Sequence, residues 1–309
     1  MNTQANAMHE SPHDSQVIAP AVISVTRRMY WSVRRELWES RSIYIAPLAV
    51  AAVILFGFLI STIGLPHKMR ALSALDPMQQ HELIEQPYSF AALLIMGTTF
   101  IVGVFYCLDA LHGERRDRSI LFWKSLPVSD LTTVLSKASI PLVVLPLLTF
   151  AITVATQLIM LLLSIAVLLG SGLSVATLWT QLSLFQMSLM LLYHLLTVHA
   201  LWYAPIFGWL LLVSGWARRA AFLWAVLPVL AIGVVEKIAF NTSHFAALLG
   251  SRVGGGAEAV AFAPGSVLDP MTQLTLGKFL SSPGLWIGLA VAAAFLAAAV
   301  RLRRYQGPI

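Results

Sequence analysis

Four polar side chains interrupt the long apolar stretches of this sequence and are its first candidates for chemistry. Gln157 lies in one stretch, and Gln186, His194 and His199 lie in the next. Ionisable or polar groups at membrane depth are costly and commonly mark a functional site. The two histidines are five residues apart rather than four, so their spacing argues against two metal ligands on one helix face. We interpret Gln157, His194 and His199 either as hydrogen-bonded packing residues or as candidate contacts for a molecule that crosses the membrane.

No catalytic constellation accompanies these residues. Cys107 is the one cysteine of the sequence, which excludes an intrachain disulfide and a cysteine metal cluster. Asp109 stands alone at the end of an apolar run, without a second carboxylate or a nucleophile and base beside it. The nearest approach to an ATP-binding loop, at 276–279, has Thr272 in place of the first glycine and Phe279 in place of Ser or Thr. The sequence therefore predicts neither an intramembrane enzyme nor an ATPase within this chain.

The composition around these residues is typical of a bilayer protein. Of the 309 residues, 58% are hydrophobic and 11% are charged, whereas about 25% are charged in soluble domains. So few charges cannot cover the surface of such a chain in water, and its hydrophobicity also excludes disorder. The expected fold class is all-α: a polytopic membrane helix bundle with an amphipathic interface helix and a cytoplasmic coupling helix.

Six apolar runs approach or exceed the roughly 20 residues that a helix needs to cross a bilayer. We predict transmembrane helices over about 43–64, 90–111, 140–169, 184–213, 222–235 and 285–300. The length of the third run implies tilt or extension beyond the lipid, and Pro205 is expected to kink the fourth. The fifth run is short, so five spans are the alternative. We assign 25–309 to a single transmembrane domain and 1–24 to a disordered cytoplasmic tail.

Basic residues are divided unequally between the two sides of this topology. Fifteen of the 20 Lys and Arg residues fall on the side of the amino terminus. Lys and Arg are enriched in the cytoplasmic loops of membrane proteins, so we predict a multi-pass protein of the cytoplasmic (inner) membrane with both termini in the cytoplasm. The net charge of +6 then lies near anionic lipid, which attracts it, and it requires no nucleic acid as a partner.

Residues 25–41 predict an amphipathic helix before the first span. At 100° per residue, five apolar side chains between Val25 and Leu37 fall within an arc of about 140°, and most of the charges lie opposite. We expect this helix to lie on the inner leaflet. It serves either as an anchor or as a lever that a cytoplasmic partner pushes. Its interface residues are Arg27, Arg28, Trp31, Arg34, Arg35 and Trp38.

The loop between the second and third spans, residues 112–139, is the most informative segment, because a simple connection would be much shorter. We expect one helical piece over 114–125, a break at 126–127, and a second helix capped by Ser129 or Asp130. The first piece contains a dense apolar and aromatic group flanked by Arg and Lys. Such a group is a candidate hot spot for a protein partner.

The segment ERRDRSILFWKSLPVSDLTTVLSK of this loop resembles the cytoplasmic loop of permease subunits of ATP-binding-cassette exporters of the type-2 class. The segment WYAPIFGWLLLVSGWARRAAFLW, residues 202–224, is similar to the fourth and fifth spans of that family, and the resemblance covers roughly 25–305. It implies a coupling helix that docks into a cleft of a separate ATPase subunit. The residues that it implies face the ATPase are Glu114, Arg115, Arg116, Arg118, Phe122, Trp123, Lys124, Ser125, Leu126 and Pro127.

The resemblance also implies a function and partners. A hydrophobic or amphipathic molecule would be exported with ATP and Mg²⁺ bound on the partner ATPase, and this chain would bind no cofactor. A six-span subunit would be half of a pathway, so a homodimer or heterodimer with a second permease subunit is implied. The small residues Gly284, Gly288 and Ala292 allow close packing, either in that dimer or within the chain.

Two alternatives remain open. The basic and aromatic loop residues could serve only membrane topology and lipid contact. The whole protein could also be a membrane scaffold or a secondary transporter that has no ATPase partner.

Overall fold

The chain is an all-α polytopic membrane helix bundle. The computed structural model describes residues 24–72, 75–125, 128–254, 276–307 and 309, so the predicted tail lies outside the described residues except for Ser24. Within those residues six helical segments are long and apolar enough to cross a membrane, as predicted. These segments are Ser42–Leu72, Pro77–Arg116, Asp130–Gly170, Leu178–Trp202, Ala221–Phe240 and Pro283–Tyr305.

Long apolar runs form the principal helices, because every backbone polar group inside a bilayer has to be satisfied within the chain. These helices are α2 (Ser42–Ser61), α4 (Pro77–Ala110), α8 (Leu145–Gly170), α10 (Leu184–His194), α11 (Ala204–Trp216), α12 (Ala221–Phe240) and α17 (Pro283–Tyr305). The shorter elements are α1 (Val25–Glu39), η1 (Thr62–Gly64), α3 (Leu65–Leu72), α5 (His112–Arg116), α6 (Ser119–Ser125), α7 (Asp130–Ser139), η2 (Ile140–Val144), α9 (Ala176–Gln181), η3 (Leu195–Trp202), α13 (His244–Val253) and α16 (Leu276–Leu280).

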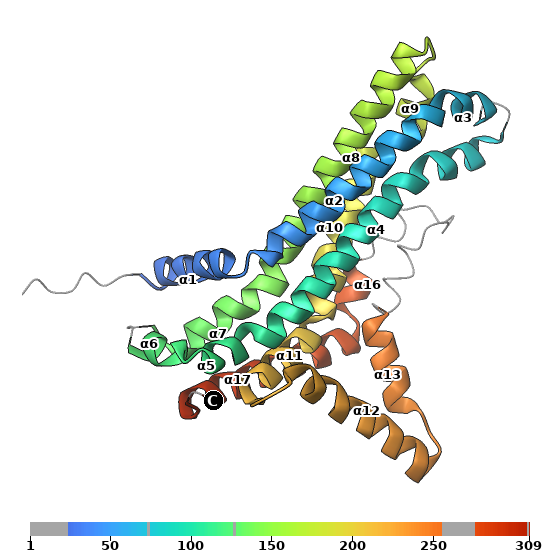
Figure 1. The fold of residues 1–309 in the computed structure, drawn as a ribbon. Coiled ribbons are helices and arrows are strands. Elements are labelled where there is room, and N and C mark those ends of the chain that lie inside the picture. The colour runs from blue at the N-terminus through green and yellow to red at the C-terminus, as the bar shows by residue number, and fades with distance from the viewer. Residues whose placement is uncertain (1–23, 73–74, 126–127, 255–275, 308) are drawn as a thin grey trace, which may run out of the picture.

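The long helices α2, α4 and α8 lie side by side, and α11 packs along both α17 and α4 (Figure 1). One apolar core cluster surrounds Phe207 and Leu145, and a second surrounds Tyr88 and Met160. The helices α1, α5, α6 and α7 gather with the last turn of α17 at one end of the bundle, which we call the charged end (Figure 1). The helices α3 and α9 lie at the opposite end.

The third and fourth predicted spans differ in how continuous they are. The third continues into α7, so that 130–170 is helical throughout, in agreement with the extension that its length implied. The fourth is interrupted, because the π-helical segment η3 ends at Trp202 and α11 starts again with Pro205 in its first turn. A proline is tolerated there, since its missing N–H would have no partner in a first turn. The predicted kink at Pro205 is therefore a break between two helices.

The fifth predicted span, 222–235, was too short. Helix α12 continues to Phe240 through Glu236 and Lys237. The predicted span ended before Glu236, because it was bounded by the first charged residue. The helix continues past Glu236, because the last turn of a transmembrane helix can be polar. At 20 residues this helix is long enough to cross a bilayer, which removes the argument for five spans.

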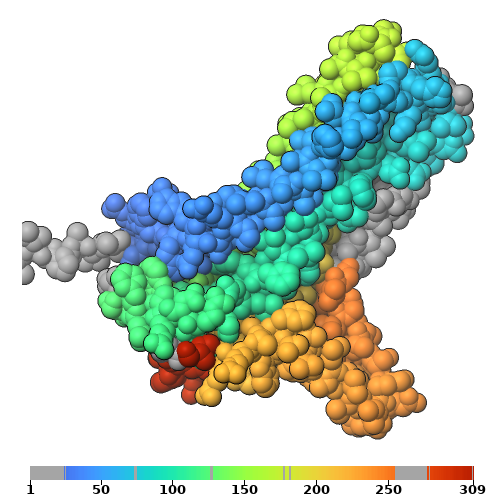
Figure 2. Space-filling model, viewed as in Figure 1, coloured from blue at the N-terminus to red at the C-terminus, as the bar shows by residue number. Residues whose placement is uncertain are grey.

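The helices α12 and α13 form a hairpin that projects from the bundle, and Figure 2 shows it as a separate lobe. Glu236 accepts the backbone N–H of His244 at 2.7 Å and so caps the start of α13. Arg252 ties the hairpin back to the bundle, because its guanidinium lies 4.2 Å from the Trp202 ring centroid and donates to the Gly284 carbonyl. Burial lowers the pKa of Arg252 from its ordinary value, and these carbonyl and ring contacts replace the lost water.

The small residues of the last span pack within the chain. A Cβ atom added at Gly208 of α11 would lie 3.3 Å from the backbone oxygen of Ala292. Gly284 and Gly288 lie against side chains from η3 and α13. Ala292 therefore packs against α11, and Gly284 and Gly288 pack against η3 and α13, which is the intrachain alternative of the two that the sequence left open.

Candidate functional site

Two local features set the direction of the predicted coupling segment. Ser214 of α11 accepts the backbone N–H groups of Leu111 and His112, both at 2.9 Å, and so satisfies donors at the start of α5. Arg118 then adopts a left-handed backbone conformation with a φ of 57°, which ends α5 and turns the chain into α6. The single helical piece predicted over 114–125 was wrong. Two short helices form instead, because a left-handed residue interrupts the helical hydrogen-bond ladder.

The second predicted helix of this loop is α7, and its cap is confirmed. The Ser129 hydroxyl accepts the backbone N–H of Thr132 at 3.1 Å. The predicted break at Leu126 and Pro127 lies outside the described residues. The connection from α6 into the third span is therefore helical on both sides of that position.

Helix α6 has one face in the bundle and one face at the surface. Ile120 is buried, whereas Leu121 and Phe122 are 58% and 59% exposed. The Phe122 ring packs edge-on against Trp123, with 5.0 Å between ring centroids. The space-filling view shows α6 at the surface of the charged end (Figure 2). Leu121 and Phe122 therefore form a small exposed apolar patch, which we call the α6 patch. The end of the molecule around this patch is rich in charged side chains.

Two contacts attach α6 to neighbouring elements. The guanidinium of Arg35 on α1 lies 3.8 Å from the centroid of the Trp123 ring, a cation–π contact. Lys124 Nζ donates to the backbone oxygen of Gln306, after the end of α17, at 2.9 Å. Because these contacts come from different elements, α6 is held from two directions.

Beneath α6 lies a group of charged side chains that we call the buried ion cluster. Lys137 Nζ lies 3.0 Å from Glu36 and 3.2 Å from Glu114. Arg303 pairs with Glu114 and, at 3.2 Å, with an oxygen of Asp130. Arg35 reaches Glu36 at 2.6 Å and Glu114 at 3.4 Å. The members are Arg35, Glu36, Glu114, Asp130, Lys137 and Arg303.

The buried ion cluster is electrically balanced and joins four elements. Its three acids and three bases cancel formally, as burial requires of charges withdrawn from water, and Arg35 also reaches the exposed Glu39 at 3.7 Å. Four of its members are at most 5% exposed: Glu36, Glu114, Lys137 and Arg303. The Tyr106 hydroxyl donates to Glu36 at 2.9 Å and satisfies a further lone pair. The cluster therefore links α1, α5, α7 and α17 through ionic contacts.

Two of the ten residues expected to face an ATPase need correction. Glu114 is 4% exposed and belongs to the buried ion cluster, and Arg115 is 7% exposed. Arg115 donates to the backbone oxygens of Gly215 at 2.7 Å and Gly307 at 3.3 Å. Both side chains point into this chain because buried partners are available there, so neither presents a surface for another protein.

The other predicted coupling residues divide between the surface and the undescribed part of the loop. Arg116, Arg118, Lys124 and Ser125 are exposed, as a contact surface requires. Arg116 also pairs with Asp117 at 3.0 Å. Phe122 and Trp123 belong to α6 as described above, and Leu126 and Pro127 are not described.

The amphipathic helix is confirmed as α1, with Ser24 as its cap. On its outer face the guanidinium of Arg34 lies 5.2 Å from the Trp31 ring centroid and 4.8 Å from that of Trp38. Both indoles are exposed, as the interface prediction requires. The remaining interface cations, Arg27 and Arg28, are exposed and half-buried respectively.

Part of the apolar face of α1 has a different role from the predicted one. Val33 and Leu37 pack against the core cluster around Phe207 rather than outward to lipid. Arg35, expected among the interface cations, instead enters the buried ion cluster. The prediction for Arg35 fails because a helical wheel shows which residues share a face but not which neighbour covers that face.

Four members of the buried ion cluster were not predicted as site residues: Glu36, Asp130, Lys137 and Arg303. One signal was available for Glu36. At 100° per residue it lies about 20° from Val25, inside the apolar arc of the helix. A carboxylate on the apolar face of a helix indicates a buried cation opposite. Nothing in the sequence separates Lys137 and Arg303 from cations that only enforce topology.

The three candidate pathway residues occupy two separate surroundings. Gln157 donates to the Tyr88 backbone oxygen at 3.3 Å, and its Oε1 has no partner among the described residues. It borders a cavity of about 220 Å³ that is mainly apolar. His199 is 4% exposed, has its Nε2 without a partner in the described part of the chain, and lies 5.8 Å from Phe207 between ring centroids. His194 is half-buried beside η3.

Comparisons and metal-site geometry add no further assignment. No protein-family model matches the chain, and no curated protein or solved structure matches it either. Among the described residues, no group of three or more His, Cys, Asp and Glu side chains could hold a metal ion. The candidate site is therefore defined by the charged end alone. It consists of the α6 patch and the buried ion cluster behind it.

Proposed function

We propose that this chain is the permease subunit of an ATP-binding-cassette exporter, in which a separate ATPase docks on α6. The observation that carries the proposal is the exposed pair Leu121 and Phe122, 58% and 59% exposed, at the charged end of the bundle. Apolar side chains surrounded by cations are typical of the central contacts of protein interfaces. Lipid is a poorer partner for this pair, because α6 lies among charged elements rather than along an apolar span.

The attachments of α6 support a mechanical role. A partner that pushes on α6 displaces Trp123 and, through it, Arg35 of α1. Behind α6 the buried ion cluster connects α5 to α7, which continues into the third span, and to α17, the last span. Force applied to the α6 patch would thus reach two transmembrane helices and the interface helix together. A rigid ionic junction suits such transmission, because its charges cannot separate without a large free-energy cost.

The transport pathway is proposed on the same basis. Two copies of this subunit, or this subunit and a similar one, would enclose a cavity between their spans. Its walls would consist mainly of Leu, Val and Ala side chains, so the cargo is proposed to be hydrophobic or amphipathic. Gln157 and His199, each with an unpartnered polar atom among the described residues, are the candidate contacts for its polar part. Both termini are proposed to be cytoplasmic, with the charged end at the inner face of the cytoplasmic membrane.

The experiment is affinity purification of the tagged full chain from its native membrane, followed by mass spectrometry of the proteins that remain bound. The expected partner is an ATP-binding-cassette ATPase in amounts comparable to the bait. Replacing Leu121 and Phe122 together with serine should lower its recovery at least about tenfold, as loss of hot-spot side chains does.

The matched control is Trp179→Ser. Trp179 is 64% exposed on α9, at the opposite end of the bundle. This variant should retain the ATPase. The proposal is contradicted if the wild-type chain recovers no such ATPase, or if the α6 variant and the α9 variant retain it equally.

A further inference from the structure

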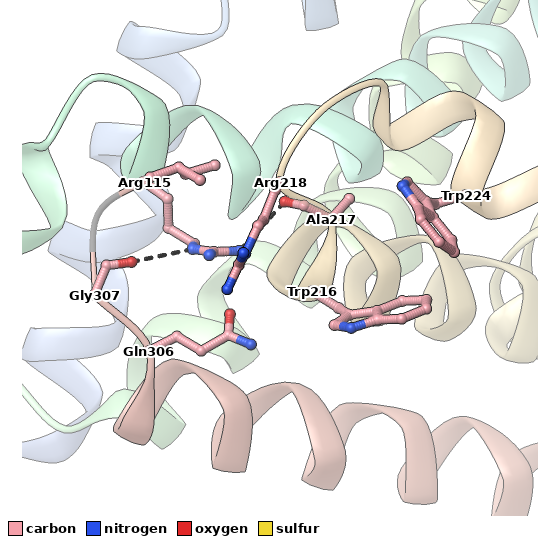
Figure 3. A pocket seen from close by; sticks show the side chains of 8 residues that line it. Arg115, Trp216, Ala217, Arg218, Trp224, Gln306 and Gly307 are labelled. Carbon is pink, nitrogen blue, oxygen red and sulfur yellow. Dashed lines mark hydrogen bonds between the residues drawn. The ribbon is translucent and has the colours of Figure 1, made fainter.

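A pocket of about 630 Å³ opens at the charged end of the bundle (Figure 3). It lies between the end of α5, the turn that follows α11 and the segment that follows α17. Its volume is within the range of roughly 300–1,000 Å³ typical of small-molecule sites. The lining residues that define its chemistry are Arg115, Trp216, Arg218, Trp224, Gln306 and Gly307.

The pocket lining contains two arginines and no Asp or Glu, and Ile309, the last residue of the sequence, also lines it. Arg115 is 7% exposed and donates to the neutral backbone oxygens of Gly215, Ala217 and Gly307. Arg218 lies near enough for the two like charges to repel each other. Neither arginine forms an ion pair with an acidic side chain of the described residues, in contrast to the balanced buried ion cluster nearby. Two neighbouring cations without an Asp or Glu partner favour the binding of an anion.

The opposite wall of the pocket is aromatic. Trp216 and Trp224 pack edge to face with 4.8 Å between ring centroids, and they are 45% and 46% exposed. The turn between α11 and α12 brings them together, because Ala220 adopts a left-handed conformation with a φ of 48° and reverses the chain. Tryptophan side chains prefer the headgroup level of a bilayer. The two arginines of the pocket therefore lie beside a pair of tryptophan side chains, at the end of α11 and the start of α12.

We propose that this pocket binds the phosphate headgroup of an anionic membrane lipid. Arg218 and Nη2 of Arg115, whose Nε and Nη1 already donate to backbone oxygens, would contact the phosphate oxygens, since guanidinium groups match phosphate geometry. Trp216 and Trp224 would lie along the glycerol and the first carbons of the acyl chains. The inference rests on the membrane location of the chain and not on the proposed exporter function.

The test is lipid binding by the full chain purified in detergent, measured by native mass spectrometry. Phosphatidylglycerol and phosphatidylcholine with the same acyl chains are titrated separately. The expected result is tighter binding of phosphatidylglycerol, and about a fivefold to tenfold loss of its affinity in Arg218→Gln, as removal of one cation near an anionic headgroup produces. The matched control is Arg219→Gln, which removes the same charge from an exposed neighbour outside the pocket lining and should change affinity less than about twofold.

Three outcomes would overturn the proposal. Equal binding of the two lipids by the wild-type chain would show that the pocket does not select an anionic headgroup. Equal losses in the Arg218 and Arg219 variants would assign the binding to diffuse surface charge. Full displacement of phosphatidylglycerol by an equal concentration of inorganic phosphate would identify a free anion, rather than a lipid, as the ligand. Arg218 is exposed, so its substitution leaves the fold intact and each result interpretable.

Discussion

Replacing Glu114 with glutamine tests whether charge holds the elements of the charged end together. The substitution preserves side-chain size and removes one negative charge from the buried ion cluster, which has three acids and three bases. Glu114 pairs with Arg303, with Lys137 at 3.2 Å and with Arg35 at 3.4 Å. All three cations therefore lose a partner, and a net positive charge is left beneath α6.

The expected magnitude follows from that geometry. Removing one partner of a buried ion pair costs about 3–5 kcal/mol of folding free energy, because the other charge stays buried without compensation. We expect Glu114→Gln to fall in this range. Adding Lys137→Met removes the matching charge, so the double variant should be at least about 1 kcal/mol more stable than the sum of the two single losses predicts.

The assay is unfolding of each purified variant in mixed micelles titrated with sodium dodecyl sulfate, followed by circular dichroism. Arg116→Gln is the control, because it removes a charge from a solvent-exposed pair with Asp117 in the same segment. Exposed pairs contribute little to stability. The reasoning would be refuted by a Glu114→Gln variant as stable as this control. Strict additivity in the double variant would also refute it.

Two further predictions concern packing and topology. Gly208→Val should destabilise the α11–α17 contact by about 1–3 kcal/mol in the same unfolding assay, because an added Cβ would lie 3.3 Å from the α17 backbone. Gly97→Val, where no atom lies within 4 Å of the added Cβ, should be close to wild type, and equal effects would contradict the packing argument. In a Cys107→Ala background, Ser251→Cys should react with an impermeant maleimide from outside intact cells and Ser125→Cys should not. The reverse pattern would overturn the predicted orientation.

The candidate site was only partly predictable from the sequence. The loop at 112–139 stands out because its length, cations and aromatic residues exceed what a connection needs. The exposed α6 patch agrees with the prediction that this loop presents an apolar and aromatic group at the surface. The inward orientation of Glu114 and Arg115 could not be predicted, because their partners come from α7, α11 and α17, more than twenty residues away along the chain. Residue type indicates that a charge needs a partner, but it does not show whether that partner is water, lipid or another side chain.

Hydropathy determined the fold class, the six spans and the amphipathic helix of this protein, because each of these properties depends on residues that are neighbours in the chain. A backbone in lipid has to bond within its own helix, so an apolar run of sufficient length leaves little choice of structure. Hydropathy did not determine the positions at which helices start and stop, as the break before Pro205 and the length of α12 show.

Tertiary structure alone decided which charges are buried and which are free. Glu36, Lys137 and Arg303 are distant in sequence, yet the packing of α1, α7 and α17 brings them to Glu114 and balances their charge. The same packing leaves Arg115 and Arg218 together without an acidic side chain in their pocket. Electrostatic energy depends on distances through space and on exposure to water, and neither quantity can be read along the chain.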